Sequence, residues 1–178
     1  MTLWVFGYGS LLWDPGFTPS ETARARLDGY HRSFCMLSIH HRGSEEDPGL
    51  VLALDRMRGG QCVGLALRVA EHEQERVLTE LRERELISSA YYEDRVPLAL
   101  DDGREIEALT YIVDTGHRQY CRFDLERQAQ IIAQAVGGRG PNVDYLNNTA
   151  AHLRELGIDD AEMRWLVRRV AELRADQS

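Results

Sequence analysis

The order of the hydrophobic segments most constrains the fold of this chain. Short runs rich in Val, Ile, Leu and Tyr come first, and the last third has helical spacing instead. The predicted strands are residues 3–7, 33–40, 50–54, 62–69, 96–100 and 106–113. The predicted helices are residues 71–87, 125–136, 143–156 and 160–173. Strands first and helices mostly later indicate an α+β fold, with a mixed, mostly antiparallel sheet, curled or barrel-like, and helices flanking it.

Turn and cap residues mark the joints between these segments. The Arg-Gly-Gly triplet at 58–60 and the Asp-Asp-Gly triplet at 101–103 are typical of hairpin turns, so antiparallel pairing is expected. The predicted helix N-caps are Asp124, Asn142 and Asp159, and the glycines expected just past helix ends are Gly137 and Gly157.

Bulk properties predict one globular domain over residues 1–178. The chain is 43% hydrophobic and 28% charged, as in ordinary globular proteins, and it is long enough to bury a sizeable core. Its net charge of −8 argues against a nucleic-acid partner, because nucleic-acid backbones require a broad basic surface. No basic leader and no long apolar run is evident, so the expected location is cytoplasmic, without a membrane partner.

Cysteine and histidine spacing predicts no metal site. Cys35, Cys62 and Cys121 are far apart and form no CxxC pair, which argues against both zinc and a disulfide framework. His40 and His41 are adjacent, and adjacent strand residues point to opposite faces, so surface or supporting roles are expected for them.

A hydrophobic run that ends in alternating glycines is the first candidate for chemistry. It comprises Val5, Phe6, Gly7, Tyr8, Gly9, Ser10 and Leu11. Glycines let backbone N–H groups approach a ligand, so this segment could bind a carboxylate or a developing oxyanion; a tight turn made for packing is the alternative. It lacks the patterns GxGxxG, GK[ST] and GxSxG. A Ser10 nucleophile would need a histidine base, for which His31, His40 and His41 are the candidates.

Glu85 is the second candidate, because it falls on the apolar stripe of the predicted helix. It follows Leu81 by four residues and Val77 by eight, whereas Glu83 should face solvent. Burial raises the pKa of a carboxyl group, which suits a general acid/base near neutral pH. The alternative is a helix-end glutamate that pairs with Arg82 or Arg84.

Six sequence blocks combine into a further signal, and they span residues 5–13, 29–35, 41–43, 48–54, 84–85 and 140–146. In their order and spacing they resemble the ChaC family of glutathione-specific γ-glutamylcyclotransferases, and the similarity runs from residue 3 to about 155. The resemblance implies a barrel with flanking helices, no cofactor, and a substrate loop formed by residues 5–10. Arg84-Glu85 matches the pair in which the family's glutamate is the catalytic acid/base, and Tyr91 follows at a suitable distance.

Two details complete the comparison of residues. Many relatives have Gly and Tyr soon after Arg-Glu, whereas residues 86–90 of this chain contain no glycine. Leu11 and Tyr145 join residues 5–10 as candidate substrate contacts; Tyr145, just inside a predicted helix, could face either the core or the site.

The implied reaction converts glutathione into 5-oxoproline and Cys-Gly. The glutamyl α-amine attacks its own side-chain carbonyl, so neither a protein nucleophile nor a metal is required, and Glu85 moves the proton. A cyclotransferase for other γ-glutamyl amino acids or amines, and a non-catalytic protein that binds γ-glutamyl compounds, remain alternatives. Hydrolysis by Ser10 is a more distant one.

Overall fold

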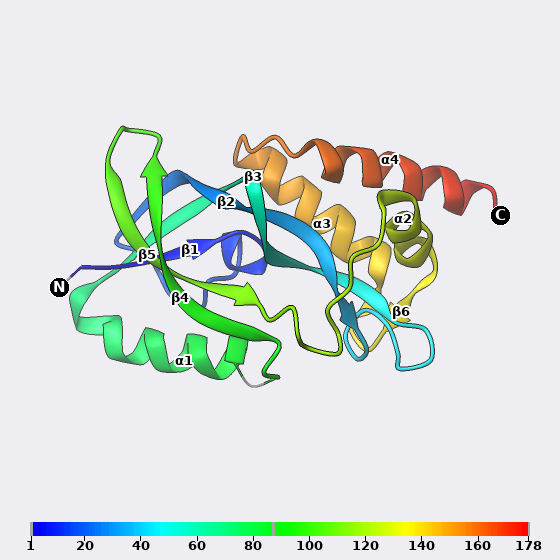
Figure 1. The fold of residues 1–178 in the computed structure, drawn as a ribbon, viewed down its shortest axis with the longest axis horizontal. Coiled ribbons are helices and arrows are strands. Elements are labelled where there is room, and N and C mark those ends of the chain that lie inside the picture. Colours follow the sequence, from blue (N-terminus) through cyan, green and yellow to red (C-terminus); the bar gives the residue numbers. More distant parts are fainter. Residues whose placement is uncertain (1, 87, 178) are drawn as a thin grey trace. The chain divides into compact units, whose positions relative to one another are not determined.

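The chain packs into two compact units that are each built from two stretches of sequence. The computed structural model describes residues 2–86 and 88–177 (Figure 1). The barrel unit comprises the residues up to Ser33 together with Ala53–His117, and the helical unit comprises Phe34–Leu52 and the residues from Arg118 onward. Strands β2 (Glu21–Ser38) and β3 (Gly49–Val69) run from one unit into the other.

A closed five-stranded barrel dominates the barrel unit (Figure 1). Its remaining strands are β1 (Leu3–Gly7), β4 (Tyr91–Leu100) and β5 (Glu105–Val113), and the order around the barrel is β1-β3-β2-β4-β5. Strand β1 pairs antiparallel with β3 and parallel with β5, while β4 is antiparallel to both β2 and β5. The expected mixed, mostly antiparallel sheet curled into a barrel is therefore confirmed.

Every residue of β1 is buried because each of its two faces meets a separate hydrophobic cluster. Trp4 and Phe6 belong to a cluster that draws side chains from all five barrel strands and fills the interior. Leu3 and Val5 point the other way and pack in a second cluster with helix α1 (Gln74–Leu86). The alternation of side chains along a strand explains why this short segment carries no polar residue.

The hairpin predicted at residues 58–60 is wrong, because the single strand β3 runs through them. The strand bends sharply there, since a Cβ on Gly60 would lie 2.9 Å from the Cβ of Met57. Gly59 does adopt a positive φ of 76°, but the chain does not reverse there. A Cβ on Gly60 would lie 3.0 Å from the carbonyl oxygen of Tyr30 in β2, so the two strands lie close together at this point. The two glycines therefore bend the strand beside β2 instead of ending it in a hairpin.

The other predicted hairpin is confirmed. Strands β4 and β5 pair along nearly their whole length, and the N–H of Gly103, at φ 92°, donates to the Leu100 carbonyl at 3.0 Å. Strand β2 begins at Glu21, well before the predicted residue 33, and its first half alternates exposed polar residues with Ala and Leu that face the barrel core. Helix α1 follows a short 3₁₀ turn, η2 (Glu71–Glu73); Ile87, the predicted helix end, lies outside the described residues.

Three helices build most of the helical unit. They are α2 (Leu125–Gln134), α3 (Asn142–Glu155) and α4 (Ala161–Ala175), with the short strands β6 (Val136–Gly137) and β7 (Gly140–Pro141) between α2 and α3. The predicted glycine after α3 is confirmed, since Gly157 has φ 71°. Gly137 instead lies in β6, where a Cβ would be 2.4 Å from the backbone nitrogen of Gly43.

The three predicted helix caps have different outcomes. Asp124 caps α2 as predicted by accepting a hydrogen bond from the Arg127 N–H. Helix α4 is capped by Asp160, and Asp159 pairs with Arg164 at 2.8 Å instead. Asn142 does not cap α3. Its side chain pairs with the backbone of Leu50, accepting from the N–H at 2.8 Å and donating to the carbonyl at 2.9 Å.

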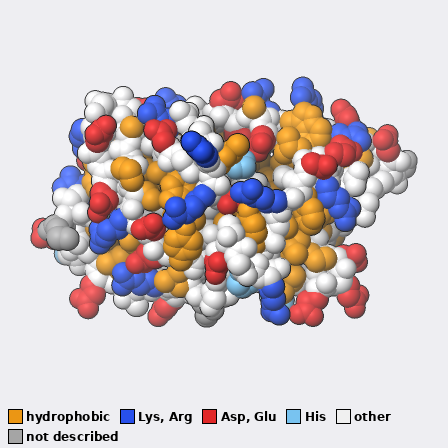
Figure 2. Space-filling model, in the orientation of Figure 1, with side chains coloured by type: hydrophobic (Ala, Val, Ile, Leu, Met, Phe, Trp, Pro, Cys, Tyr) orange, Lys and Arg blue, Asp and Glu red, His pale blue; other side chains and the backbone are white. Residues whose placement is uncertain are grey.

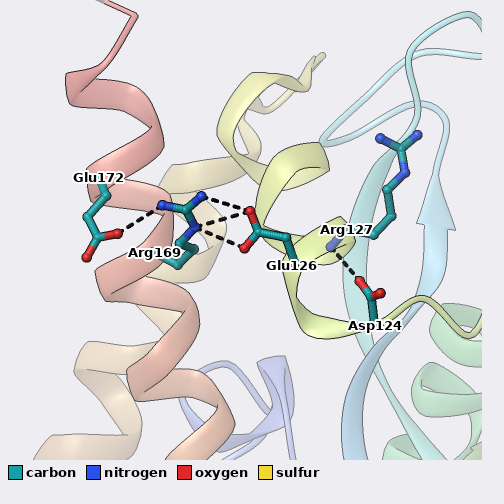
Figure 3. Close-up of polar contacts among 5 residues, drawn as sticks. All are labelled: Asp124, Glu126, Arg127, Arg169 and Glu172. Atoms are coloured by element: carbon teal, nitrogen blue, oxygen red, sulfur yellow. Dashed lines mark hydrogen bonds and ion pairs between the residues drawn. The ribbon is translucent and has the colours of Figure 1, made fainter.

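A charged cluster joins α2 to α4 in the helical unit (Figure 3). Arg169 on α4 donates from both Nε and Nη2 to the Glu126 carboxylate, each at 2.9 Å at the shortest, and from Nη1 to Glu172 at 3.0 Å. These side chains are partly exposed, so water screens their attraction. The bidentate Arg169–Glu126 pair therefore contributes more to the orientation of α4 on α2 than to the stability of the fold.

In the described parts of the chain, no helix has the length and apolar character needed to cross a bilayer. On the face drawn in Figure 2, acidic and basic side chains are interspersed.

Candidate active site

The segment after β1 forms a compact turn that begins at the two glycines. It continues into a one-turn 3₁₀ helix, η1 (Ser10–Leu12), in which the N–H groups of Leu12 and Asp14 donate to the carbonyls of Gly9 and Ser10 at 2.9 and 2.8 Å. A Cβ on Gly7 would lie 3.1 Å from the Leu11 Cβ, so glycine permits the tight return of the chain. The amides of Ser10 and Leu11 stand in the first turn, where a helix does not use its own N–H groups.

Buried polar contacts fix this turn to the barrel. The guanidinium of Arg32, 6% exposed, donates to the carbonyls of Tyr8 and Val63, both at 2.6 Å. The Tyr8 hydroxyl donates to the Tyr111 carbonyl of β5 at 3.0 Å. The turn is therefore held from β2, β3 and β5. The residue pattern of the chain did not predict the role of Arg32, which depends on contacts distant in sequence.

The buried side chains of the predicted substrate loop leave its backbone as the part that could meet a ligand. Val5 and Phe6 are fully buried, and Tyr8 and Leu11 are less than 10% exposed. Their side chains belong to the barrel's hydrophobic clusters. The main chains of Val5 and Phe6 also pair within the sheet, so the backbone that follows β1 is the part of this segment that could meet a ligand.

Arg84, near the end of α1, connects this turn to Glu85. Its Nη1 donates to the Asp14 carbonyl at 2.7 Å, and its Nη2 donates to the Ser10 hydroxyl oxygen at 2.8 Å. Its Nε lies 3.5 Å from Oε1 of Glu85. The two sequence candidates, the glycine turn and Glu85, are thus brought together through one guanidinium.

Glu85 is mostly buried, as its place on the apolar stripe predicted. Its side chain is 17% exposed, whereas Glu83 is exposed, and Val77 and Leu81 on the same stripe are fully buried. Desolvation raises the pKa of the Glu85 carboxyl group, and the positive charge of Arg84 partly opposes this effect. The alternative pairing with Arg84 is therefore also present, but burial has the larger effect on the pKa.

Polar groups on β4 and β5 lie beside this region. The Tyr111 hydroxyl donates to Glu93 at 3.0 Å, and Arg82 donates to both oxygens of Glu93, each at 3.0 Å. Burial raises the pKa of Tyr111, followed by the negative charges of Glu93 and, more weakly, Glu85. Tyr111 therefore stays a neutral phenol, and Arg82 is engaged by Glu93 rather than by Glu85.

The remaining sequence candidates have other surroundings. Ser10 accepts a hydrogen bond from Arg84, whose guanidinium has no lone pair with which to act as a base. His40 and His41 are exposed residues of the helical unit, and their carbonyls accept hydrogen bonds from Gly138 and Arg139. Within residues 2–86 and 88–177, no three His, Cys, Asp or Glu side chains gather as metal ligands would.

Tyr145 belongs to the helical unit and is partly buried there. Its hydroxyl accepts a hydrogen bond from the Leu52 N–H at 3.1 Å, and its ring packs edge-on to Phe34 with centroids 6.0 Å apart. The Arg42 guanidinium lies 5.8 Å from the ring centroid. These contacts orient the ring, and its predicted contact with substrate stays a prediction.

Comparisons with known proteins decide the family. The family model described as ChaC-like protein matches residues 3–173. The chain is also 38% identical over 176 residues to a glutathione-specific γ-glutamylcyclotransferase of Escherichia coli, covering 98% of this chain and 75% of that protein. This chain belongs to the ChaC-like family. Its predicted membership among the γ-glutamylcyclotransferases is thereby confirmed.

Further relatives of this ChaC-like chain agree in sequence and in fold. It is 30% identical to γ-glutamylcyclotransferase 2-3 of Arabidopsis thaliana, covering 97% of the chain and 90% of the plant protein. A crystal structure of a γ-glutamylcyclotransferase specific to glutathione from yeast superposes with a TM-score of 0.86, at 20% identity and with 97% of each chain covered. The yeast structure shows that the ChaC-like chain shares the fold.

The burial of Glu85 predicts a pH-dependent gain in stability for the variant Glu85→Gln. Folding raises the pKa of Glu85 above its ordinary value of 4.5, so the native state binds the proton more tightly than the unfolded chain. Below pH 4.5 both the native and the unfolded state hold the proton, and no buried charge then destabilises the native state. As the pH rises through the native pKa, Glu85 ionises while buried, and the free energy of unfolding of the wild type falls. The free energy of unfolding of Glu85→Gln should therefore exceed that of the wild type at pH 7.

Urea denaturation at pH 4 and pH 7 measures this difference. The gain of Glu85→Gln should shrink at pH 4, and the exposed control Glu83→Gln should show no such pH dependence. A gain that is equal at both pH values would contradict a buried, titrating Glu85.

Proposed function

We propose that this chain converts glutathione into 5-oxoproline and Cys-Gly, with Glu85 as the general acid/base. The observation that carries the proposal is a mostly buried carboxylate, with a raised pKa, linked through Arg84 to the glycine turn after β1. The name of the Escherichia coli relative, a glutathione-specific γ-glutamylcyclotransferase, supports this choice of substrate.

The proposed reaction exchanges one C–N bond for another, and in it the glutamyl nitrogen loses two protons while the nitrogen of Cys-Gly gains two. Ionised Glu85 takes a proton from the glutamyl α-ammonium group, and the freed amine attacks the γ-carbonyl carbon of the same residue. A five-membered ring closes through a tetrahedral oxyanion. The γ-amide C–N bond then breaks as Glu85 returns the proton to the departing nitrogen of Cys-Gly. The ring nitrogen releases its second proton to solvent, which leaves a neutral lactam, and the freed amine of Cys-Gly takes up one proton from solvent.

The turn after β1 would bind the negative charge of the substrate. The amides of Ser10 and Leu11 are available at the start of η1, and they suit either the α-carboxylate or the oxyanion. We propose the backbone of the predicted segment 5–11, at the turn that follows β1, as this binding surface.

Assays with two substrates test the proposal. Purified protein is incubated with glutathione and, separately, with γ-Glu-Ala, and 5-oxoproline and the released amine are measured by mass spectrometry. Release from glutathione alone is expected. Comparable release from γ-Glu-Ala would point to a broader cyclotransferase, and binding of glutathione without release would point to a non-catalytic binding protein.

The pH dependence of turnover tests the role of Glu85 independently. Glu85 must be ionised to accept the α-ammonium proton, so kcat/KM should fall as the pH drops through the pKa of Glu85. Because burial raises that pKa, the acid limb should lie above the ordinary carboxyl value of 4.5. An acid limb at or below 4.5 would contradict this assignment.

A further inference from the structure

We propose that Arg84 is a positioning residue that holds the turn after β1 in fixed register with the carboxylate of Glu85. The inference rests on the proposed function, because it concerns the alignment of the substrate-binding backbone with the proton carrier. Arg84 comes from α1, and Ser10, which it contacts, lies 74 residues earlier in the chain.

All three nitrogens of the Arg84 guanidinium are engaged. Nη1 and Nη2 reach the Asp14 carbonyl and the Ser10 hydroxyl at 2.7 and 2.8 Å, and Nε faces Glu85 at 3.5 Å. A planar guanidinium fixes these directions relative to one another, whereas a lysine ammonium is a single point on a flexible stem. The geometry therefore couples two contacts with the turn to one with the carboxylate.

The charge of Arg84 also acts on Glu85, beyond its role as a donor. The positive charge of Arg84 lowers the pKa of the Glu85 carboxyl group. The negative charge of Glu85 in turn helps to raise the pKa of Tyr111 on β5. Glu93 on β4 is bound by Arg82 and Tyr111. Loss of the positive charge at position 84 should therefore raise the pKa of Glu85 further.

The packing of Arg84 decides which variants separate these effects. Its side chain, 34% exposed, lines a cavity of about 210 Å³ together with Phe17 and Leu81. Arg84→Met keeps an unbranched apolar stem there but loses the charge and the donors. Arg84→Lys keeps the charge but loses the fork. Arg76→Met is the matched control, because Arg76 lies on α1 and pairs with Glu73 and Glu80 on its exposed side.

The experiment measures kcat and KM for glutathione from pH 4 to pH 9 in the wild type and the three variants. Loss of a charge-assisted hydrogen bond should lower kcat/KM of Arg84→Lys by about 10- to 100-fold with its acid limb unchanged. Arg84→Met should show a similar loss and an acid limb at higher pH. Arg76→Met should match the wild type.

Either of two results would overturn the proposal: wild-type kcat/KM in Arg84→Lys, or an acid limb of Arg84→Met that coincides with that of the wild type. Should Arg84→Met fail to fold, Arg84→Lys alone decides the positioning role.

Hydrogen exchange distinguishes failure of this inference from failure of the proposed function. The peptide covering residues 9–16 contains the turn, and its amides should exchange faster in Arg84→Lys than in Arg76→Met, whether or not glutathione is turned over. Equal exchange in the two variants would contradict the positioning role of Arg84. Absence of turnover in the wild type, with faster exchange in Arg84→Lys, would overturn the proposed function and leave the positioning role of Arg84 intact.

Discussion

Glu85→Gln will abolish most turnover of glutathione while leaving the protein folded. Gln keeps the size and the hydrogen-bonding ends of the side chain but cannot carry a proton between two nitrogens. General acid/base catalysis contributes about 10²- to 10⁴-fold, so kcat should fall by that factor. Steady-state assays of 5-oxoproline release measure the loss, and isothermal titration with glutathione checks that binding persists.

Glu83→Gln is the matched control for this result. It makes the same chemical change on the same helix, two residues earlier, at an exposed position. Its kcat and KM should equal those of the wild type. Turnover by Glu85→Gln within a factor of two of the control would exclude Glu85 as the proton carrier and direct attention to other groups near the turn.

Asn142→Ala will destabilise the helical unit by about 3 kcal/mol. The Asn142 side chain is fully buried, and it satisfies both the N–H and the carbonyl of Leu50 at the start of β3. Alanine would leave both backbone groups buried without these partners, and each such loss costs about 1–3 kcal/mol. Urea denaturation followed by circular dichroism measures the change.

Asn147→Ala provides the comparison on the same helix. Asn147 is exposed, so its replacement should change the free energy of unfolding by less than about 0.5 kcal/mol. If Asn142→Ala and Asn147→Ala unfold at the same urea concentration, the paired hydrogen bonds to Leu50 contribute little, and Asn142 would serve another purpose.

The sequence predicted those parts of the fold and the site that depend on residues close together in the chain. The apolar run ending at Gly7 became β1, and the 3.6-residue period placed Glu85 on the buried stripe of α1. Asp124 has the cap position that its sequence neighbours indicate. These features arise from side-chain periodicity and from hydrogen bonds within a few residues.

Features that depend on distant partners could not be predicted in this way. The Gly-Gly pair at 59–60 has turn chemistry, yet β3 runs on beside β2. Asn142 has the sequence position of a helix cap, yet the backbone of Leu50, 92 residues earlier, binds its side chain. The three contacts of Arg84 likewise join α1 to a turn near the N-terminus, and no local period indicates them.

The interleaving of the two units affects how the chain folds during synthesis. Residues 34–52 leave the ribosome early, but the helices that complete their unit begin only after His117. At about 5–20 residues per second, the 65 residues of Ala53–His117 delay those helices by about 3 to 13 s. During that interval the backbone of Leu50 lacks its two hydrogen bonds with the Asn142 side chain. The barrel unit can close first, and the first stretch of the helical unit, Phe34–Leu52, is then synthesised but lacks the helices that complete its unit.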